Sequence, residues 1–310
     1  MSRRVFDCFL FNAELDLLEF RLDLLADLVD HHVVVEAPRT YSGESKPLHF
    51  AENQARFARH ADRIIHVVVD DLPLPDPAQN GRWLPENFQR RAIARGLTEA
   101  EPDDIVLLCD VDEIPDPAVL STVIGGLTQP VALDMRLSYL RANWTSSQRW
   151  TLAKAAPFGS FDDLQQLRIM PSSLLVPSAG CHFSYLMGDD QISVKLRTYA
   201  HDEFDTPLFT DPHFLRTCIA GGFFPLTNEP LRMAPRTDLD AVQRKLLAVR
   251  PDLFDFDGLP SPWLRHLMHG YLKRRQSRHV PASARRGADA VLSRVVGAQR
   301  SGPAGDRRHG

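Results

Sequence analysis

Two aspartates placed two positions apart are the strongest candidates for chemistry in this sequence. Asp110-Val111-Asp112 directly follows the apolar run Ile105–Cys109, which predicts a buried strand that ends at the pair. Carboxylates at positions i and i+2 just past a strand end point the same way, so they can share one divalent cation, directly or through water. Such oxygen ligands suit Mg²⁺ or Mn²⁺, and a diphosphate can complete the shell. The alternative is an acidic turn at a sheet edge.

Apolar runs and amphipathic stretches alternate along the first part of the chain and predict an α/β fold. This alternation implies right-handed crossovers and a mostly parallel sheet with helices on both faces. Ligands of such sheets bind outside the carboxyl ends of the strands, so polar residues there should converge on one crevice. The predicted strands are Val5–Phe11, His32–Glu36, Ile64–Val69, Ile105–Cys109 and Val131–Leu137, and the predicted helices are about 16 residues after Asn12, then Trp83–Gly96 and about Pro117–Leu127.

Composition places the chain among globular proteins and excludes several other classes. Of 310 residues, 44% are apolar and 25% are charged, and the formal charge of −4 argues against nucleic acid as the main partner. The sequence has no apolar run of about 18 residues, so no transmembrane helix is expected. Asp7 and Asn12 interrupt the first apolar stretch, so no signal peptide is expected. The four cysteines lack metal-ligand spacing and sit in apolar segments, which predicts buried thiols in a cytoplasmic protein.

The C-terminal end of the chain is strongly basic. Residues 263–310 carry eleven Lys and Arg against two Asp. From Ser277 onward the sequence is rich in Arg, Ala, Gly, Ser and Pro with little apolar periodicity, so 277–310 is predicted to be a disordered basic tail. Such a tail either stays solvated or makes a peripheral contact with an anionic membrane surface or an acidic partner.

Several motifs along the first three quarters of the chain are informative because of their order. They are Asp7–Leu22, Val33–Glu36, Thr40–Leu48, Asp110–Pro115 and Ala179–Tyr185, followed by Lys195, Leu196 and His201. Together this set, which covers about residues 5–235, resembles glycosyltransferase family 17. One departure is Cys181, where the family is expected to have Trp. This difference affects the expected wall of the donor or acceptor site at that residue, and it does not affect the expected fold.

The resemblance implies an α/β fold of the GT-A type, with a Rossmann-type, mostly parallel sheet flanked by helices. A single catalytic domain would span residues 1–276, with a donor half at about 1–137 and an acceptor half at about 138–276, before the tail. It also implies an inverting, metal-dependent glycosyltransferase connected with protein N-linked glycosylation. Its donor would be a UDP-sugar, UDP-N-acetylglucosamine, and its acceptor a hydroxyl of a glycan or glycoconjugate.

A departing diphosphate needs cations to neutralise its charge. The acidic pair would meet this need by holding a divalent metal ion. Asp112 is the predicted direct ligand of Mn²⁺ or Mg²⁺, while Asp110 would reach the ribose or a metal-bound water. The resemblance implies a metal shell that includes one His from later in the chain. His201 is the predicted ligand, with His182 as the other candidate and His213 in reserve. A lone His is otherwise most often a buried hydrogen-bonding residue.

Four further donor-site residues are predicted near the carboxyl edge of the sheet. Asn12 and Glu14 sit at the first strand–helix turn, Glu36 ends the second strand, and Lys46 follows a polar loop. Glu36 could accept from the base or ribose, and Lys46 could close on phosphate. Each has a plain structural alternative: helix capping for the first two, a capping or salt-bridged carboxylate for Glu36, and an exposed lysine for Lys46.

Two adjacent arginines and two tryptophans complete the donor-side and acceptor-side candidates. One of Arg90 and Arg91 is expected to neutralise the diphosphate while the other is a surface residue, and Arg91 is the predicted one. Trp144 and Trp150 could each stack on a sugar face or pack in the core.

Inversion at an anomeric carbon is a single displacement, so it needs one base and no covalent nucleophile. The segment Gly188-Asp189-Asp190-Gln191-Ile192 resembles the acidic loop that opens a helix in inverting GT-A enzymes. Asp190 is the predicted base, and Asp189 is predicted to bind an acceptor or donor hydroxyl. The alternative is an acidic N-terminal pair for a helix over Ile192–Arg197.

Two other functions remain open at this point. A nucleotidyl- or phosphoryl-transfer enzyme could use the aspartate pair for metal chemistry, but it needs a second carboxylate cluster or an early Asp nucleophile. Asp7 lies within the first predicted strand rather than at its end, which disfavours that function. The other is a non-catalytic module that binds nucleotide sugars or glycans, and the intact Asp110, Asp112 and Asp190 speak against it.

Overall fold

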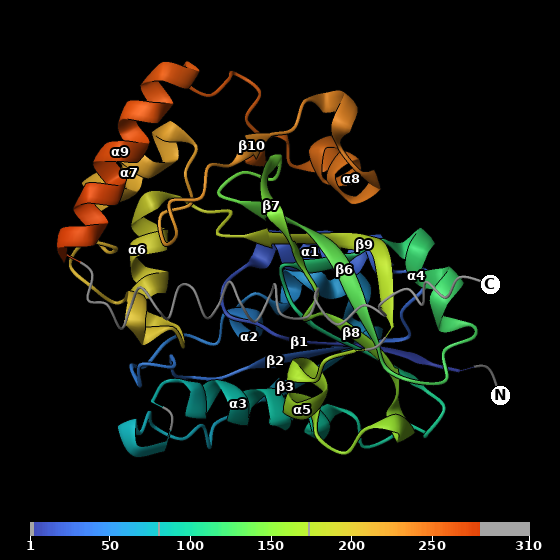
Figure 1. Ribbon diagram of the computed structural model, residues 1–310. Helices are drawn as coiled ribbons and strands as arrows, with labels where there is room; N and C mark the ends of the chain where they lie inside the picture. Colours follow the sequence, from blue (N-terminus) through green and yellow to red (C-terminus); the bar gives the residue numbers. More distant parts are fainter. Residues whose placement is uncertain (1–2, 80, 173, 280–310) are drawn as a thin grey trace, which may run out of the picture.

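One mixed sheet forms the centre of the structure, a computed structural model that describes residues 3–79, 81–172 and 174–279 (Figure 1). Its strand order within these residues is β10-β7-β6-β8-β4-β1-β2-β3, and β9 pairs with both β6 and β5. The strands are β1 (Val5–Leu10), β2 (His31–Glu36), β3 (Ile64–Val68), β4 (Ile105–Asp110), β5 (Glu113–Pro115), β6 (Val131–Tyr139), β7 (Trp144–Trp150), β8 (Lys154–Pro157), β9 (Leu175–Ser184) and β10 (Arg232–Met233).

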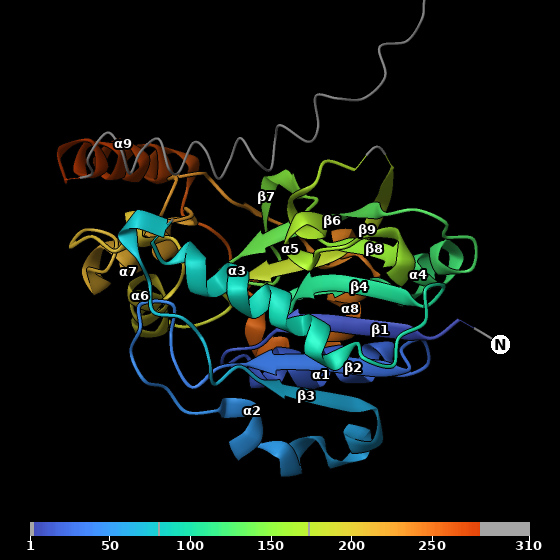
Figure 2. The ribbon, with the colours of Figure 1, turned by 90° about the horizontal axis from the view of Figure 1, so that it is seen from below.

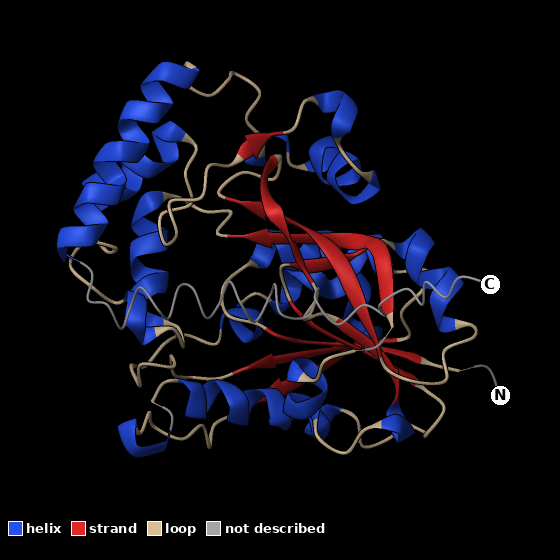
Figure 3. Cartoon of the chain, in the orientation of Figure 1, coloured by secondary structure: helices blue, strands red, loops and turns tan. Residues whose placement is uncertain are grey.

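Helices surround this sheet (Figure 3). The α-helices are α1 (Leu15–Leu25), α2 (His49–Glu52), α3 (Trp83–Arg91), α4 (Pro117–Ile124), α5 (Leu164–Ile169), α6 (Asp189–Thr198), α7 (Pro212–Gly221), α8 (Ala241–Val249) and α9 (Pro262–His279). Short 3₁₀ helices are η1 (Gln54–Arg63), η2 (Pro77–Gln79), η3 (Ala92–Gly96), η4 (Phe158–Ser160), η5 (Asp202–Phe204), η6 (Arg236–Asp238) and η7 (Pro251–Leu253).

The strands β3, β2, β1 and β4 run parallel to one another, as Figure 2 shows from below. The predicted α/β fold with a mostly parallel central sheet flanked by helices is confirmed. Beyond β4 the sheet continues through four antiparallel pairs, which are β4–β8, β8–β6, β6–β7 and β7–β10. The strand β9 lies parallel to β6. An extension of the sheet by residues 140–235 was expected, but the sequence did not give the bounds of these strands because their residues lack a regular apolar alternation.

Two phenylalanines of β1 pack against helices on opposite faces of the sheet. Phe6 packs on the side of η3 with Ile93, whereas Phe9 packs on the side of α1 with Leu18 and Leu22. All five side chains are almost fully buried. Burying each contributes roughly 2 kcal/mol from the hydrophobic effect, and the two-sided packing explains why the strand sequence is apolar at nearly every position.

A separate apolar cluster joins α6, α7 and α9 beside the carboxyl edge of the sheet (left in Figure 1). It includes Phe204, Phe209, Phe214, Leu215, Cys218 and Leu272. This helical layer lies within the predicted acceptor half, although that division of the domain remains a prediction. α9 continues to His279, so the first residues of the predicted tail are helical. Residues 280–310 lie outside the described residues.

All four cysteines are buried free thiols, as predicted, and burial raises the pKa of each. The cytoplasmic location inferred from them remains a prediction. Cys181 faces a core cluster with its Sγ 3.0 Å from Asp240, away from the cavity described below, so the departure from Trp does not alter the cavity wall. Among the described residues, no helix combines the length and apolarity needed to cross a membrane.

Candidate active site at the carboxyl end of β4

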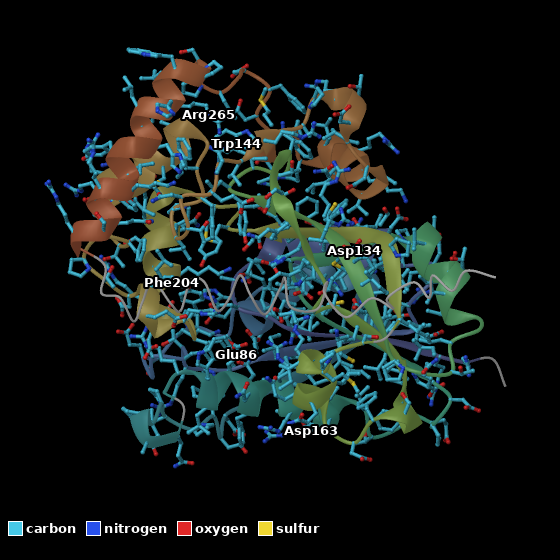
Figure 4. All side chains as sticks on the ribbon, viewed as in Figure 1. Glu86, Asp134, Trp144, Asp163, Phe204 and Arg265 are labelled. Carbon is cyan, nitrogen blue, oxygen red and sulfur yellow. The ribbon has the colours of Figure 1, made fainter. Side chains whose placement is uncertain are left out.

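A cavity of about 730 Å³ opens at the carboxyl ends of the parallel strands. Its walls come from the turns after β1 and β4, from α3, α5 and α6, and from β9. Glu86 on α3 and Phe204 in η5, both labelled in Figure 4, are two of its lining residues. The polar residues among its lining include Asn12, Glu14, Arg39, Lys46, Glu86, Arg90, Asp110, Asp112, Arg168, His182, Lys195 and His201. The prediction that strand-end side chains converge is met for the first and fourth strands.

Asp110 is held between two arginines at the mouth of β4. Arg90 Nη1 donates to Oδ1 and Arg168 Nη2 donates to Oδ2, each at 2.8 Å. Burial would raise the pKa of Asp110, but the two guanidinium groups outweigh it and hold that pKa well below its usual range. Because both carboxylate oxygens are engaged by guanidinium, Asp110 is less free than Asp112 to bind a metal directly.

Asp112 faces a histidine from a different part of the chain. His182 Nε2 lies 3.5 Å from Asp112 Oδ1, and both side chains are nearly buried in the cavity wall. Burial opposes the charged forms, yet each partner favours the charge of the other, so the pKa of Asp112 is lowered and that of His182 is raised. Antiparallel pairing of β9 with β5 sets this arrangement, because it places His182 opposite Glu113, the residue after Asp112.

Carboxylate oxygens suit Mn²⁺ and Mg²⁺, and the neutral imidazole of His is a common ligand of metal ions. The Asp112–His182 pair fits such an ion as two neighbouring donors, and a diphosphate and water would supply the remaining ligands. Among residues 3–79, 81–172 and 174–279, no three His, Cys, Asp or Glu side chains are grouped to hold a metal. The predicted set of Asp110, Asp112 and His201 is therefore not brought together.

Glu113 fixes the backbone of the acidic turn from behind. This fully buried carboxylate accepts from the indole Nε1 of Trp150 at 2.5 Å, from the backbone N–H of Asp110 at 3.0 Å and from the guanidinium of Arg168. Arg21 of α1 supports the same turn by donating to the carbonyl oxygen of Glu113 at 2.6 Å. Four hydrogen-bonded contacts thus position the turn that carries both aspartates.

A buried ion pair anchors Arg21 in turn. Asp7 on β1 accepts from Arg21 at 2.5 and 2.8 Å and pairs with His32 Nδ1 at 2.9 Å. Burial would raise the pKa of Asp7, but Arg21 and His32 lower it to about 2. Asp7 is therefore a structural carboxylate beneath the site, which agrees with its position inside the strand.

A comparison of the sequence with known families identifies its relatives. The sequence profile of glycosyltransferase family 17 matches residues 1–223. The chain belongs to glycosyltransferase family 17. The family predicted from the motifs is therefore confirmed.

Curated relatives of this family 17 chain match over a shorter region. The β-1,4-mannosyl-glycoprotein 4-β-N-acetylglucosaminyltransferases of Rattus norvegicus and Homo sapiens are each 34% identical over 154 residues. That region is 46% of this chain and 28% of each relative. Among solved structures, glucosyl-3-phosphoglycerate synthase from Mycobacterium tuberculosis, in complex with Mn²⁺, UDP and phosphoglyceric acid, covers 59% of this chain and 69% of its own at 18% identity. The TM-score of that structure against this chain is 0.30.

Three predicted donor-site residues of the family 17 chain line the cavity. Asn12 and Glu14 stand at its β1 side; the helix cap is Glu14 rather than Asn12, and it makes no side-chain capping bond. Glu14 instead lies 3.8 Å from Lys195 Nζ. Lys46 also faces the cavity, and burial lowers its pKa. Their binding roles remain predictions that this placement permits.

Two other predicted donor-site residues lie outside the cavity lining. Glu36 is buried, accepts from the backbone N–H groups of Phe50 and Ala51 at 3.0 Å, and pairs with His66, so it has the structural role weighed as the alternative. Arg91 is half exposed and pairs with Asp163. Its neighbour Arg90 is the arginine that faces the cavity, because adjacent residues of a helix point about 100° apart.

The predicted base also lies outside the lining formed by the described residues. Asp189 and Asp190 open α6, where Asp189 pairs with Arg216 at 2.9 Å and Asp190 is exposed. The two aspartates thus form the acidic N-terminal pair of a helix, which was the alternative to a catalytic base. The catalytic role of either residue remains a prediction. The same helix delivers Lys195 into the cavity about one and a half turns later.

Of the remaining histidine and tryptophan candidates, His201 and Trp150 line the cavity and Trp144 does not. His201 lines the cavity but bonds Glu203 through Nδ1 at 2.7 Å and packs edge-on against Trp83. Trp150 lines the cavity beside His182, with ring centroids 4.3 Å apart, whereas Trp144 is buried in the helical cluster. Arg168 was missed because nothing in the local sequence of α5 marks it.

Proposed function

We propose that this chain is an inverting glycosyltransferase that uses UDP-N-acetylglucosamine as donor and a hydroxyl of a glycan or glycoconjugate as acceptor. The observation that carries the proposal is the Asp112–His182 pair, which faces a cavity at the carboxyl end of β4 in a family 17 chain. The names of the curated relatives, which transfer N-acetylglucosamine, support the choice of sugar.

Charge and volume in the cavity support a nucleotide-sugar donor. A volume of about 730 Å³ lies within the usual range of small-molecule sites. Lys195, which neighbouring carboxylates keep charged despite burial, faces the same space as Asp112 and is our proposed partner for the diphosphate. Asp112 and His182 would hold a divalent cation, Mn²⁺ or Mg²⁺, which supplies neutralisation of the charge that develops on the departing diphosphate.

The acceptor sugar is proposed to lie against an aromatic wall of the cavity, formed by Tyr139, Phe224 and Trp83. Tyr139 and Phe224 stack there with centroids 3.8 Å apart, and Trp83 lines the same cavity. Aromatic faces of this kind pack on the apolar faces of sugars. The acceptor hydroxyl needs a base, for which Glu14 is the better placed carboxylate because it lines the cavity, while Asp190 remains the candidate from the sequence.

UDP release from UDP-N-acetylglucosamine and other UDP-sugars, with and without Mn²⁺ and a panel of glycan acceptors, tests the proposal. We expect metal-dependent release, highest for UDP-N-acetylglucosamine, that acceptor accelerates. Asp112→Asn should lower the rate at least a hundredfold, on the scale of a lost transition-state electrostatic contact. Asp103→Asn, an exposed aspartate in the turn before β4, is the matched control and should leave the rate unchanged.

The same assay separates the competing functions. A non-catalytic module would bind the nucleotide sugar in a calorimeter without releasing UDP. A nucleotidyl- or phosphoryl-transfer enzyme would release pyrophosphate, UMP or phosphate in place of UDP. Either result, or equal rates for Asp112→Asn and the parent protein, contradicts the proposed transferase.

A further inference from the structure

The long helix α9 exposes large apolar side chains on its outward side. Trp263 is 71% exposed, Leu267 is 49% exposed, and Leu264 and Tyr271 are each 42% exposed. Because an α-helix turns 100° per residue, Trp263, Leu267 and Tyr271 at intervals of four form one stripe along its first two and a half turns. A contiguous exposed stripe of this kind marks an interaction surface, whereas scattered apolar residues do not.

The opposite side of α9 is fixed to the protein, so the stripe cannot turn inward. Arg265 Nε donates to the carbonyl oxygen of Gly221 at 2.9 Å, His269 stacks on Phe223 with centroids 5.1 Å apart, and Gln276 donates to Pro225 at 2.8 Å. Leu272 is fully buried between these contacts. Figure 2 shows α9 as an outer element of the molecule.

Positive charge continues the apolar stripe toward the helix C-terminus. Arg274 and Arg278 follow Trp263 by 11 and 15 positions, which places both on the stripe side of the helix, and both are exposed. Residues 263–279 contain no Asp or Glu, and six further Arg against two Asp follow in the sequence. An exposed Trp, aliphatic side chains and cations on one helix face are the composition of helices that lie in a membrane interface.

We propose that the outward face of α9, made of Trp263, Leu264, Leu267, Tyr271, Arg274 and Arg278, docks on an anionic membrane surface. The apolar side chains enter the boundary between headgroups and acyl chains, and the arginines bind lipid phosphates with their stems along the same surface. The positive charge of residues 263–310 complements an anionic lipid, whereas the remainder of the chain is acidic overall. The proposal goes beyond the proposed reaction and does not depend on it.

Vesicle binding by the full chain tests this docking surface. The vesicles contain phosphatidylcholine alone or phosphatidylcholine with phosphatidylglycerol, and binding is measured by co-sedimentation at low and high salt. We expect tight, salt-sensitive binding to the anionic vesicles alone. Trp263→Ser with Leu267→Ser should weaken it at least tenfold, and Arg274→Gln with Arg278→Gln about thirtyfold. The controls Val249→Ser and Lys245→Gln, exposed positions on α8, should bind as the parent does.

Several outcomes would overturn the proposal. One is that the protein shows no preference for anionic vesicles. Another is that the α8 controls lose as much vesicle binding as the α9 variants. A third is that the α9 variants bind like the parent, which would assign binding to the sequence after His279. Sedimentation equilibrium that shows a dimer, lost in the Trp263→Ser and Leu267→Ser protein, would mean that a second copy covers the face. Circular dichroism confirms folding of each variant, and unchanged UDP release shows that the reaction is separate from docking.

Discussion

Arg168 and Glu113 form the ion pair on which the acidic turn rests. The guanidinium of Arg168 donates to both carboxylate oxygens of Glu113 and also to Asp110 Oδ2 at 2.8 Å. Glu113 belongs to β5, Asp110 ends β4 and Arg168 lies on α5, so one buried cation ties three elements together. Neither local propensity nor apolar packing provides this link, and its removal leaves a buried carboxylate without its charge partner.

Replacing Arg168 with Gln should destabilise the fold by about 3 kcal/mol, because removing one member of a buried pair leaves the other charge uncompensated. Urea unfolding followed by circular dichroism measures the change. Arg91→Gln is the matched control, since Arg91 pairs with Asp163 at the surface and should cost at most about 1 kcal/mol. A loss at Arg168 no larger than the loss at Arg91 would show that the turn does not depend on this pair.

His182→Gln should raise the Mn²⁺ concentration needed for half-maximal UDP release at least tenfold, because the pair would lose its imidazole donor. His201→Gln should leave that concentration close to the parent value, since His201 is bonded to Glu203 and stands apart from Asp112. Titration of free Mn²⁺ by electron paramagnetic resonance gives the affinity without relying on turnover. The reverse order of effects would restore His201 as the ligand.

Lys195→Met should weaken binding of UDP about tenfold or more while leaving binding of uridine unchanged, because the lysine is proposed to contact the diphosphate rather than the nucleoside. Calorimetry with each ligand measures the two affinities. Lys245→Met on α8 serves as control for the loss of one positive charge. Equal weakening of UDP and uridine would mean that Lys195 shapes the cavity instead of binding phosphate.

Acid should destabilise the parent protein more than it destabilises Asp7→Asn. The pKa of Asp7 is about 2 in the fold and 3.8 without its partners, so its charge stabilises the fold above about pH 4. That contribution, on the order of 2 kcal/mol, is lost as pH falls through 2. Urea unfolding between pH 7 and pH 2 should show the free-energy gap between the two proteins shrinking over this range, while Asp103→Asn follows the parent. A gap independent of pH would exclude a charged Asp7 as the source.

Sequence patterns located the strands and the acidic turn well. β1, β2, β3 and β4 fall within one residue of the predicted bounds at either end, because strands buried on both faces are apolar throughout and end at polar residues. The predicted helix over Trp83–Gly96 corresponds to α3 followed by η3. Local patterns suffice here because each element carries its own signal.

The partners within the site depend on tertiary contacts that local patterns do not encode. Arg90 and Arg91 are neighbours on α3, whose buried positions include Gln89 and Arg90, so no apolar stripe reveals which arginine faces inward. His182 and His201 both follow the aspartates, and their distance from Asp112 depends on strand pairing. Arg168 reaches Asp110 from 58 positions away, without a motif of its own.

The pairing of β5 with β9 has a consequence for redesign of this scaffold. Gly180 of β9 lies so close to β5 that an added Cβ would be 2.2 Å from the carbonyl oxygen of Ile114. This close approach holds the two strands at one spacing. A slip by one residue would present Cys181 or Phe183 in place of His182. Ladder hydrogen bonds, rather than a flexible connection, thus carry the imidazole to its carboxylate. Trp83 and Phe224 belong to neither strand, so replacing them to alter the proposed acceptor site leaves the ladder between β5 and β9 in place.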